Sequence, residues 1–402
     1  MPSYPRLSNV SANGMFPCCA RTLLVLAVCC TVASSAFAQT PLSEPRSAAL
    51  SEIRRGDPTA AALILLDALR KWPDDVSAID EAVPSIYLFL FTMEYLVDEP
   101  ARRDFCTHVM QEDKNPVDDM LLTGLYLNLD SGLDQEEFNA VGRKLQALSV
   151  DPKPMVRAIA MMVLAAPYYY RDSIIALNNR QALVKHFPQL EITKAALRAP
   201  LYAARKKIID EPDAVIRSVE DDGLAEARRN DPVIQGMRTA VADLKRTSQS
   251  EGAARVFAEA TRSAASVEDR YANLYMLEPF AAGGKSAECK AAVLDLAMRP
   301  AETADSTYAR IQMLRMAAIA QDAAELRRWA DALLAQDDLG NGYSRNLFED
   351  LVKDVSAAAE ALAKAGDPQG AAARLDVLAA RFPNSPVAST AKARAVQLRE
   401  AK

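Results

Sequence analysis

The chain has 402 residues, with 47 Lys and Arg against 53 Asp and Glu, a formal charge of −6, and 50% hydrophobic residues. An acidic chain without clustered basic residues argues against nucleic acid as a partner, because phosphate binding needs Lys and Arg to displace counterions. Aromatic residues make up only 6% and Gly is scarce at 14, so the apolar content is mainly Ala and Leu, which favour helices. The 22 prolines fall mainly between segments of helical length. These features predict an all-α fold of helical hairpins.

Residues 1–38 have the layout of a secretory signal peptide. Arg21 precedes an apolar run from Thr22 to Val32, and Ala36-Phe37-Ala38 offers small residues at a cleavage site. The run is too short to span a bilayer. We therefore expect cleavage after Ala38 and a periplasmic or secreted mature protein that has no transmembrane segment.

The cysteines leave two questions open. Four of the six lie in the signal segment, and a lipoprotein signal ending at Cys29 is the alternative to cleavage after Ala38. Val28 is bulky where such signals have Gly, Ala or Ser, which favours the soluble form. Cys106 and Cys289 remain in the mature chain, too few for a disulfide framework. We expect two small buried side chains, with a long-range disulfide as the alternative.

The mature chain begins and ends with the same pattern at the same spacing. In each copy a Gly-Asp-Pro turn leads into a helix with small residues on one face, and the helix stops at an aromatic-Pro pair. The first copy is Gly56-Asp57-Pro58 with Ala61, Ala62, Leu65, Ala68, Leu69 and Trp72-Pro73, and the last is Gly366-Asp367-Pro368 with Ala371, Ala372, Leu375, Leu378, Ala379 and Phe382-Pro383.

This unit resembles the tetratricopeptide repeat (TPR). That family has a Gly ending helix A, a small residue early in helix B, a bulky residue four later, then Ala-Leu and a closing Pro. These roles fall on Gly56, Ala61, Leu65, Ala68 and Pro73, and in the last copy on Gly366, Ala371, Leu375 and Pro383. The resemblance implies a superhelical array of helical hairpins, a TPR-like α-solenoid, in which the small residues let helix B approach helix A.

Weaker copies lie between these two. They centre on Ala140 with Lys144, on Ala176 with Arg180, on Cys289 with Val293, and on Trp329. We expect repeats in residues 39–190 and 281–402, and a helical segment with unclear repeats in residues 191–280. The most apolar mature run, Ile86 to Val97, contains Glu94 and predicts a buried helix.

A basic-aromatic-proline ending recurs at the close of three predicted helices. The copies are Lys71-Trp72-Pro73, His186-Phe187-Pro188 and Arg381-Phe382-Pro383, the last continuing as Asn384-Ser385-Pro386. This last run resembles repeats of bacterial envelope assembly and cell-division proteins. The aromatic residues themselves are expected to cap the hydrophobic seam between helices.

No pattern in the sequence predicts a catalytic, cofactor-binding or metal site. The two histidines, His108 and His186, are far apart, and His108 with Cys106 at i and i+2 diverge on a helix. Tyr168-Tyr169-Tyr170 is the densest aromatic cluster. One or two core tyrosines are expected there, and a contact to a peptide or glycan is the alternative.

These observations predict an exported, non-catalytic scaffold or adaptor of the bacterial cell envelope, whose partners are other envelope proteins or peptides. Two alternatives stay open. Some cell-wall lytic transglycosylases resemble this chain in having a long Ala-rich superhelix, although no catalytic Glu-Ser signature follows here. The lipoprotein alternative would make the chain a lipid-anchored subunit of an outer-membrane assembly complex.

Overall fold

The computed structural model describes residues 43–111, 115–129, 135–165, 174–220, 223–281, 287–300, 303–336, 345–384 and 386–400, and over these residues the protein is all-helical, with no strand. The helices are α2 (Ser43–Arg55), α3 (Pro58–Arg70), η2 (Val76–Ala78), α4 (Ile79–Phe91), η3 (Thr92–Leu96), α5 (Glu99–Gln111), α6 (Pro116–Leu129), α7 (Gln135–Leu148), α8 (Pro154–Ala165), α9 (Ile174–His186), α10 (Glu191–Ala204), η4 (Arg205–Lys207), α11 (Pro212–Glu220), α12 (Pro232–Thr247), α13 (Ser250–Ser263), α14 (Val267–Ala281), α15 (Ala287–Ala297), α16 (Ala304–Ala320), α17 (Ala323–Leu334), α18 (Arg345–Lys364), α19 (Pro368–Arg381) and α20 (Pro386–Glu400).

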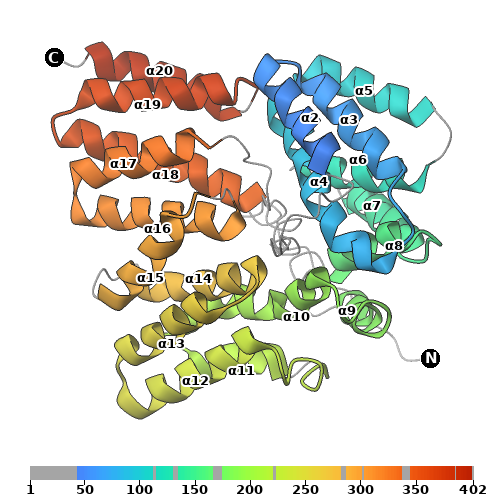
Figure 1. Ribbon diagram of the computed structural model, residues 1–402, viewed down its shortest axis with the longest axis horizontal. Coiled ribbons are helices and arrows are strands. Elements are labelled where there is room, and N and C mark those ends of the chain that lie inside the picture. Colours follow the sequence, from blue (N-terminus) through green and yellow to red (C-terminus); the bar gives the residue numbers. More distant parts are fainter. Residues whose placement is uncertain are drawn as a thin grey trace, which may run out of the picture.

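Helices that follow one another in the chain pack side by side. From α12 onward helices also contact the next but one: α12, α14, α16, α18 and α20 form one row of successive contacts, and on the other side α13 contacts α15 and α17 contacts α19. Figure 1 shows α2–α8 as one block and α11–α20 as an arc, with α9 and α10 between them. Residues 191–280, where the sequence shows no clear repeat, are therefore helical over most of their described part and continuous with the arc.

The arc returns to the first block, where residues from the two ends of the described chain meet. The Phe91 and Phe382 rings pack edge to face with centroids 6.1 Å apart. The side-chain amide of Asn384 donates to the carbonyl of Leu96 at 2.6 Å. Both contacts come from the loop after α19 and from the end of the α4–η3 run, so the helices close into a ring (Figure 1).

The two Gly-Asp-Pro turns have the same backbone geometry. Gly56 and Gly366 end α2 and α18 in the left-handed region, with φ of 85° and 88°. At both turns the glycine amide donates to the carbonyl three residues back, at 3.0 and 3.1 Å, and the next amide donates five residues back, at 2.9 and 3.0 Å. This is the Schellman motif, which favours Gly because a Cβ is strained at this φ.

The aspartate of each turn starts the following helix. Asp57 and Asp367 accept a hydrogen bond from the amide three residues on, at 2.9 Å in both cases, and a proline occupies the first helical position. Because the cap satisfies an amide that has no partner within the helix, α3 and α19 begin at fixed residues. Their first inward residues, Ala61 and Ala371, are both fully buried.

The helical run Val76–Leu96 is the most apolar part of the described chain. By length and composition alone it could cross a membrane, but 72% of its most apolar window is buried inside the protein. Residues Thr92–Leu96 at its end form a π-helical turn. Packing against α3 and α6 gives it the surroundings of a core helix.

Candidate functional site

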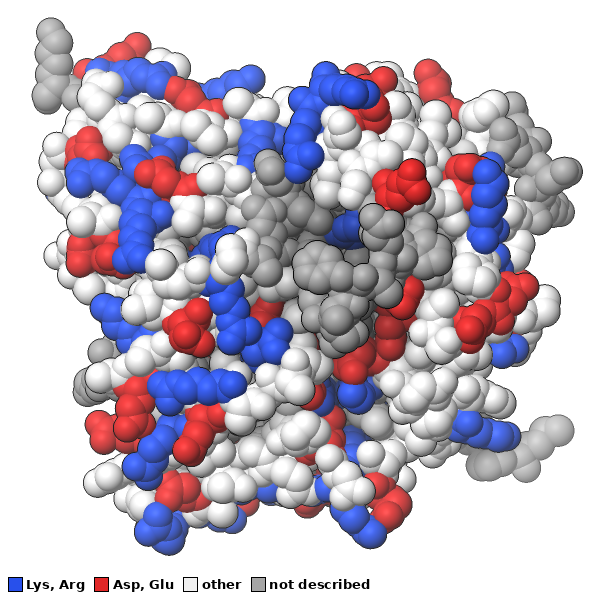
Figure 2. All heavy atoms as spheres, in the orientation of Figure 1, with Lys and Arg blue, Asp and Glu red and all other residues white. Residues whose placement is uncertain are grey.

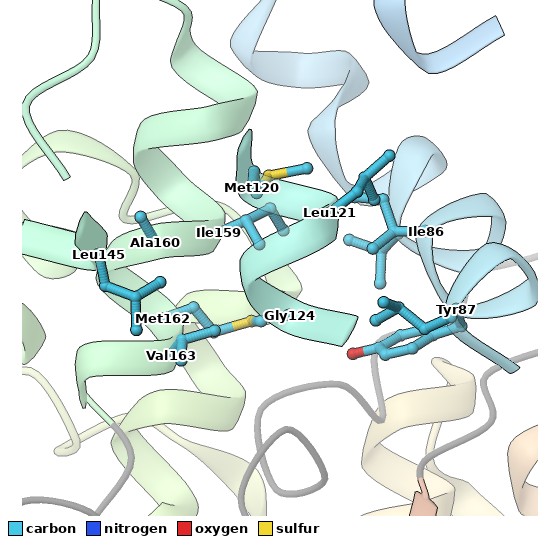
Figure 3. A pocket seen from close by; sticks show the side chains of 12 residues that line it. Ile86, Tyr87, Met120, Leu121, Gly124, Leu145, Ile159, Ala160, Met162 and Val163 are labelled. Carbon is cyan, nitrogen blue, oxygen red and sulfur yellow. The ribbon is translucent and has the colours of Figure 1, made fainter. Parts of the chain in front are cut away.

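The apolar hollow in the first block is too small to hold more than a water molecule. It measures about 20 Å³ and is lined by side chains of α4, α6, α7 and α8 (Figure 3). Gly124 and Ala160 leave the space because they have little or no side chain. A volume of this size is about that of one water, and the lining is apolar apart from Tyr87. The hollow is a feature of core packing.

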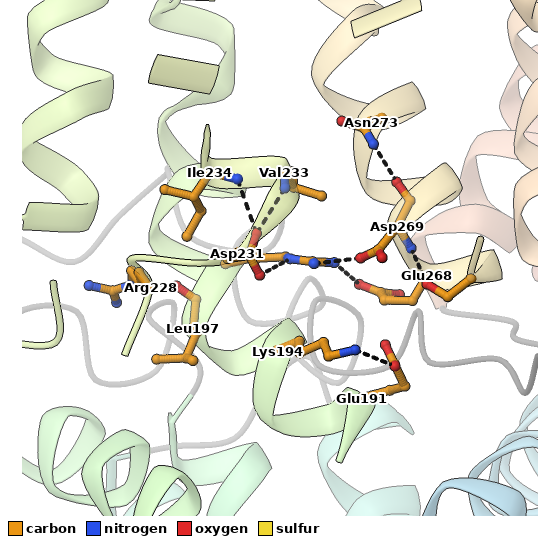
Figure 4. A network of polar contacts seen from close by, with 12 residues as sticks. Glu191, Lys194, Leu197, Arg228, Asp231, Val233, Ile234, Glu268, Asp269 and Asn273 are labelled. Atoms are coloured by element: carbon orange, nitrogen blue, oxygen red, sulfur yellow. Dashed lines mark hydrogen bonds and ion pairs between the residues drawn. The ribbon is translucent and has the colours of Figure 1, made fainter. Parts of the chain in front are cut away.

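A buried ionic network joins α10 to the beginnings of α12 and α14. The guanidinium of Arg198 is fully buried and donates to Asp231 at 2.8 Å and to Asp269 at 2.5 Å, with Glu268 at 3.6 Å (Figure 4). Asp231 also caps α12 by accepting from the amides of residues 233 and 234, each at 3.0 Å. One cation therefore fixes the relative positions of three helices.

The surroundings raise the pKa of two members of this network, which favours the charged form of Arg198 and the neutral form of Glu268. Burial disfavours the charge on Arg198, but the attraction of Asp231 and the other acids outweighs it and raises the pKa of the guanidinium. Burial raises the pKa of Glu268 well above its ordinary value, despite the attraction of Arg198. Arg198 is consequently a permanent cation, and burial favours the protonated form of Glu268.

A second cluster follows directly along α10, α14 and α16. We name it the tyrosine–arginine cluster; its members are Tyr202, Arg205, Tyr271, Tyr275, Glu278, Tyr308 and Arg315. The Tyr275 ring lies at its centre, 5.4 Å from the Tyr202 ring and 5.6 Å from the Tyr308 ring, and stacked on Tyr271 at 5.9 Å. The guanidinium of Arg205 lies 3.7 Å from the Tyr275 centroid, a close cation–π contact.

The Glu278 carboxylate holds the charged part of the tyrosine–arginine cluster together. It accepts from Arg205 at 2.8 Å, from Arg315 at 3.0 Å and from the hydroxyl of Tyr308 at 2.9 Å. Burial opposes the charge of Glu278, but the two guanidinium groups and the hydroxyl outweigh it and lower the pKa of the carboxyl. Burial, and next the charge of Glu278, raise the pKa of Tyr308 well above its usual range, so its hydroxyl remains a donor.

Arg315 extends the tyrosine–arginine cluster to α18, where solvent reaches it. Its other nitrogens pair with Asp354 at 2.7 Å and with Asp350 at 3.1 Å. The side chains of Arg315 and Asp350 are 25% and 33% exposed, and that of Glu278 is 23% exposed. The cluster therefore has a buried aromatic part, held in place by its ring contacts, and a partly exposed rim that carries both positive and negative charges.

The residues that the repeat pattern singles out lie in two turn–helix units at opposite ends of the chain, around α3 and α19. Of the first copy, Ala61 and Leu65 are fully buried, Ala68 is partly buried, and Gly56 and Pro73 are exposed. In the last copy, Ala371 is fully buried and Leu375 nearly so, while Gly366 and Pro383 are exposed. Their positions follow from helix packing and capping.

The weaker copies differ in how well the structure agrees with them. In α9 the buried residues are Ala176, Arg180 and Leu183, as the pattern predicts. In α7 the register is wrong: Ala140 and Lys144 are exposed, and Val141 and Leu145 are buried instead. Lys144 pairs with Asp119 of α6 at 2.6 Å, so it lies at the surface and not between repeats.

The remaining sequence candidates form no chemical centre in the described residues. Cys106 and Cys289 are free thiols, half-buried and buried. No group of three His, Cys, Asp or Glu side chains in this part of the chain could hold a metal. Trp72, Phe187 and Phe382 are buried, as expected for residues that cap the seam between helices. Tyr168-Tyr169-Tyr170 and residues 1–38 lie outside the described residues.

Sequence reasoning missed the tyrosine–arginine cluster. Its one local signal is the pair Tyr271 and Tyr275, which share a helix face at i and i+4. The other tyrosines come from α10 and α16 and meet them only through packing. On the face drawn in Figure 2, acidic and basic side chains of the described residues are interspersed, without a large area of one sign.

Comparison of the chain with protein-family models, with curated proteins and with solved structures finds no match. The site is therefore interpreted from its own geometry.

Proposed function

We propose that this chain is an exported, non-catalytic scaffold, a TPR-like α-solenoid that holds another envelope protein or peptide. The repeat interpretation is supported by the equal geometry of the Gly56 and Gly366 turns and by the full burial of Ala61 and Ala371. A row of alternate helices, each packed on its neighbours, agrees with an array in which every unit contacts only the next.

The observation that carries the binding proposal is the tyrosine–arginine cluster. Tyr and Arg are the residues that most often dominate protein–protein affinity, especially when they are held rigidly before the partner arrives. Tyr275 is clamped by three tyrosines and Arg205, and Arg315 is fixed by three carboxylates. When a partner binds to this rim, the side chains of the cluster lose little conformational entropy, because their neighbours already hold them in place.

A pull-down with the purified mature protein tests this proposal. We expect it to retain one or a few envelope proteins, and Tyr275→Leu to weaken their binding by at least about tenfold, the effect of losing one hot-spot side chain. The control is Arg328→Ala on α17, which removes a different cation–π contact, that of Arg328 with the Trp329 ring at 4.6 Å. If circular dichroism shows that both variants are folded and they bind equally well, the cluster is not the binding site.

The same preparation separates the scaffold from its alternatives. Release of muropeptides from peptidoglycan, abolished by changing a single Glu, would favour the lytic transglycosylase. Mass analysis of the exported protein tests the signal: a chain beginning at Gln39 supports the soluble form, and a lipid on Cys29 supports the anchored subunit. Capture that weakens when salt is raised from about 0.05 to 0.5 M would indicate that rim charges steer the encounter.

A further inference from the structure

The ring of helices has one junction that the chain itself does not span. Elsewhere around the ring, most helices that follow one another in the chain also pack on each other. Between the arc and the first block, the hydrogen bond from Asn384 to Leu96 joins residues 288 positions apart. In the described part of the chain, α19 packs extensively on α17, α18 and α20, but on no helix of the first block. The two sides of this junction can therefore separate without unfolding a helix (Figure 1).

Each aromatic ring at the junction is held in place by its own side. The Phe91 ring contacts the Tyr95 ring of the π-helical turn, with centroids 5.6 Å apart. The amide of Phe382 donates to the carbonyl of Leu378 in α19 at 3.2 Å, and Pro383 restricts the backbone of the residue before it. Both rings are thus positioned before they meet, so closing the junction orders few groups and opening it releases few.

The carbonyl groups at the end of the π-helical turn explain why the arc binds there. The last carbonyls of a helix have no partner within it. Arg102 of α5 donates to two of them, those of Met93 and Glu94, at 3.2 and 3.3 Å. The carbonyl of Leu96 accepts from Asn384 at 2.6 Å, in a hydrogen bond that is exposed to solvent. Water can replace Asn384 when the sides separate, so opening leaves this carbonyl with a donor.

We propose that Phe91, Leu96, Phe382 and Asn384 form a latch that opens and closes while the helical hairpins stay folded. An edge-to-face ring pair and a hydrogen bond each favour the closed ring by about two- to tenfold. Because these factors are small, the open ring is a minor state, on the order of a few per cent of the molecules. The proposal concerns the motion of the ring and does not depend on which partner the chain binds.

Distance measurement by double electron–electron resonance in the purified protein tests the latch. Nitroxide side chains replace Arg103 in α5 and Val396 in α20, two exposed residues on the two sides of the junction. We expect a main population at one distance and a minor one at longer distances. Asn384→Asp keeps the size of the side chain but replaces the donor by an acceptor, which the Leu96 carbonyl repels. The longer population should therefore rise by about two- to tenfold.

The variant Phe382→Leu tests the aromatic half of the latch. Leu still covers the seam between helices but loses the edge-to-face contact with Phe91, so the longer population should rise by a similar factor, and further when Asn384→Asp is added. The control is Phe187→Leu: Phe187 is a fully buried ring of the same basic-aromatic-proline ending, but it follows α9. This control should leave the distances unchanged.

Circular dichroism and the melting temperature of each variant distinguish opening from unfolding. Longer distances at full helical content support the latch. The proposal is overturned if Asn384→Asp and Phe382→Leu both give the distances of the unmodified protein. It is also overturned if longer distances appear only together with loss of helix, because the ring would then open only by unfolding.

Discussion

Replacing Arg198 by Met removes the one cation of a buried ionic network and leaves its acids in place. Asp231, Glu268 and Asp269 surround this guanidinium, and their side chains are 6%, 0% and 16% exposed. Met has a similar length and no charge, so the substitution changes the electrostatics more than the packing. The prediction therefore isolates what the cation contributes.

The expected loss is large because carboxylates, and not only hydrogen bonds, are left unpaired. Removing one partner of a buried ion pair costs about 3–5 kcal/mol, since the remaining charge has been taken out of water without compensation. Three acids share this cation, so we place the loss near the upper end, about 5 kcal/mol at pH 7.5. A protein at the lower end of the ordinary range of stability, about 5–15 kcal/mol, would be close to unfolding.

Urea unfolding of both proteins between pH 5 and pH 8 measures this loss. Without Arg198 the acids lose the positive charge that compensates theirs, so the deficit should shrink in mild acid, where protons neutralise carboxylates. The control is Arg102→Met: Arg102 is partly buried and donates to the carbonyls of Met93 and Glu94, at 3.2 and 3.3 Å. Because these acceptors are neutral, its deficit should not depend on pH.

Adding Asp269→Asn to Arg198→Met should recover part of the loss at pH 7.5, because one of the unpaired charges is then absent. The reasoning is refuted if Arg198→Met loses less than about 1 kcal/mol, or if its deficit is the same at pH 5 and pH 8.

Three further changes test the capping and packing of the helices by thermal or urea unfolding. Gln321→Gly should stabilise by about 0.5–1 kcal/mol, because Gln321 ends α16 with φ of 55°, where Gly has no strain; a loss would mean that its side chain contributes unrecognised contacts. Asp57→Ala should cost about 1 kcal/mol by removing the cap of α3, with the exposed Asp67→Ala as control. Ala371→Glu should cost several kcal/mol by burying an unpaired charge, and an unchanged melting temperature would remove Ala371 from the helix crossing.

Local signals in the sequence were sufficient for the all-α class and for the turns at the two ends. In Gly-Asp-Pro the Gly adopts the left-handed conformation, the Asp caps the next helix and the Pro takes the first helical position. Three consecutive residues therefore determine the turn, and no distant residue is needed. The α16–α17 turn has the same two amide hydrogen bonds, at 3.2 and 3.0 Å, but uses Gln321-Asp322. The sequence does not predict this turn, because Gln rarely indicates a residue in the left-handed conformation.

Features that depend on distant residues could not be predicted. The register of α7 was misplaced by one residue because Ala140 and Lys144 fit the repeat spacing, whereas the actual core selects Val141 and Leu145. A helix dominated by Ala and charged residues has few large side chains to fix its buried face. The tyrosine–arginine cluster and the ionic network around Arg198 combine residues from separate helices, which no local pattern records.

The contact between Phe91 and Phe382 has a consequence for how the protein is made. Synthesis proceeds from the N-terminus, so the α4–η3 run emerges nearly three hundred residues before the loop that it binds. Neighbouring hairpins can fold as they appear, because their contacts are local. Joining the two ends must wait for the complete chain. A nascent or C-terminally truncated molecule therefore exposes Phe91 to chaperones and proteases, and closure of the ring marks a finished chain.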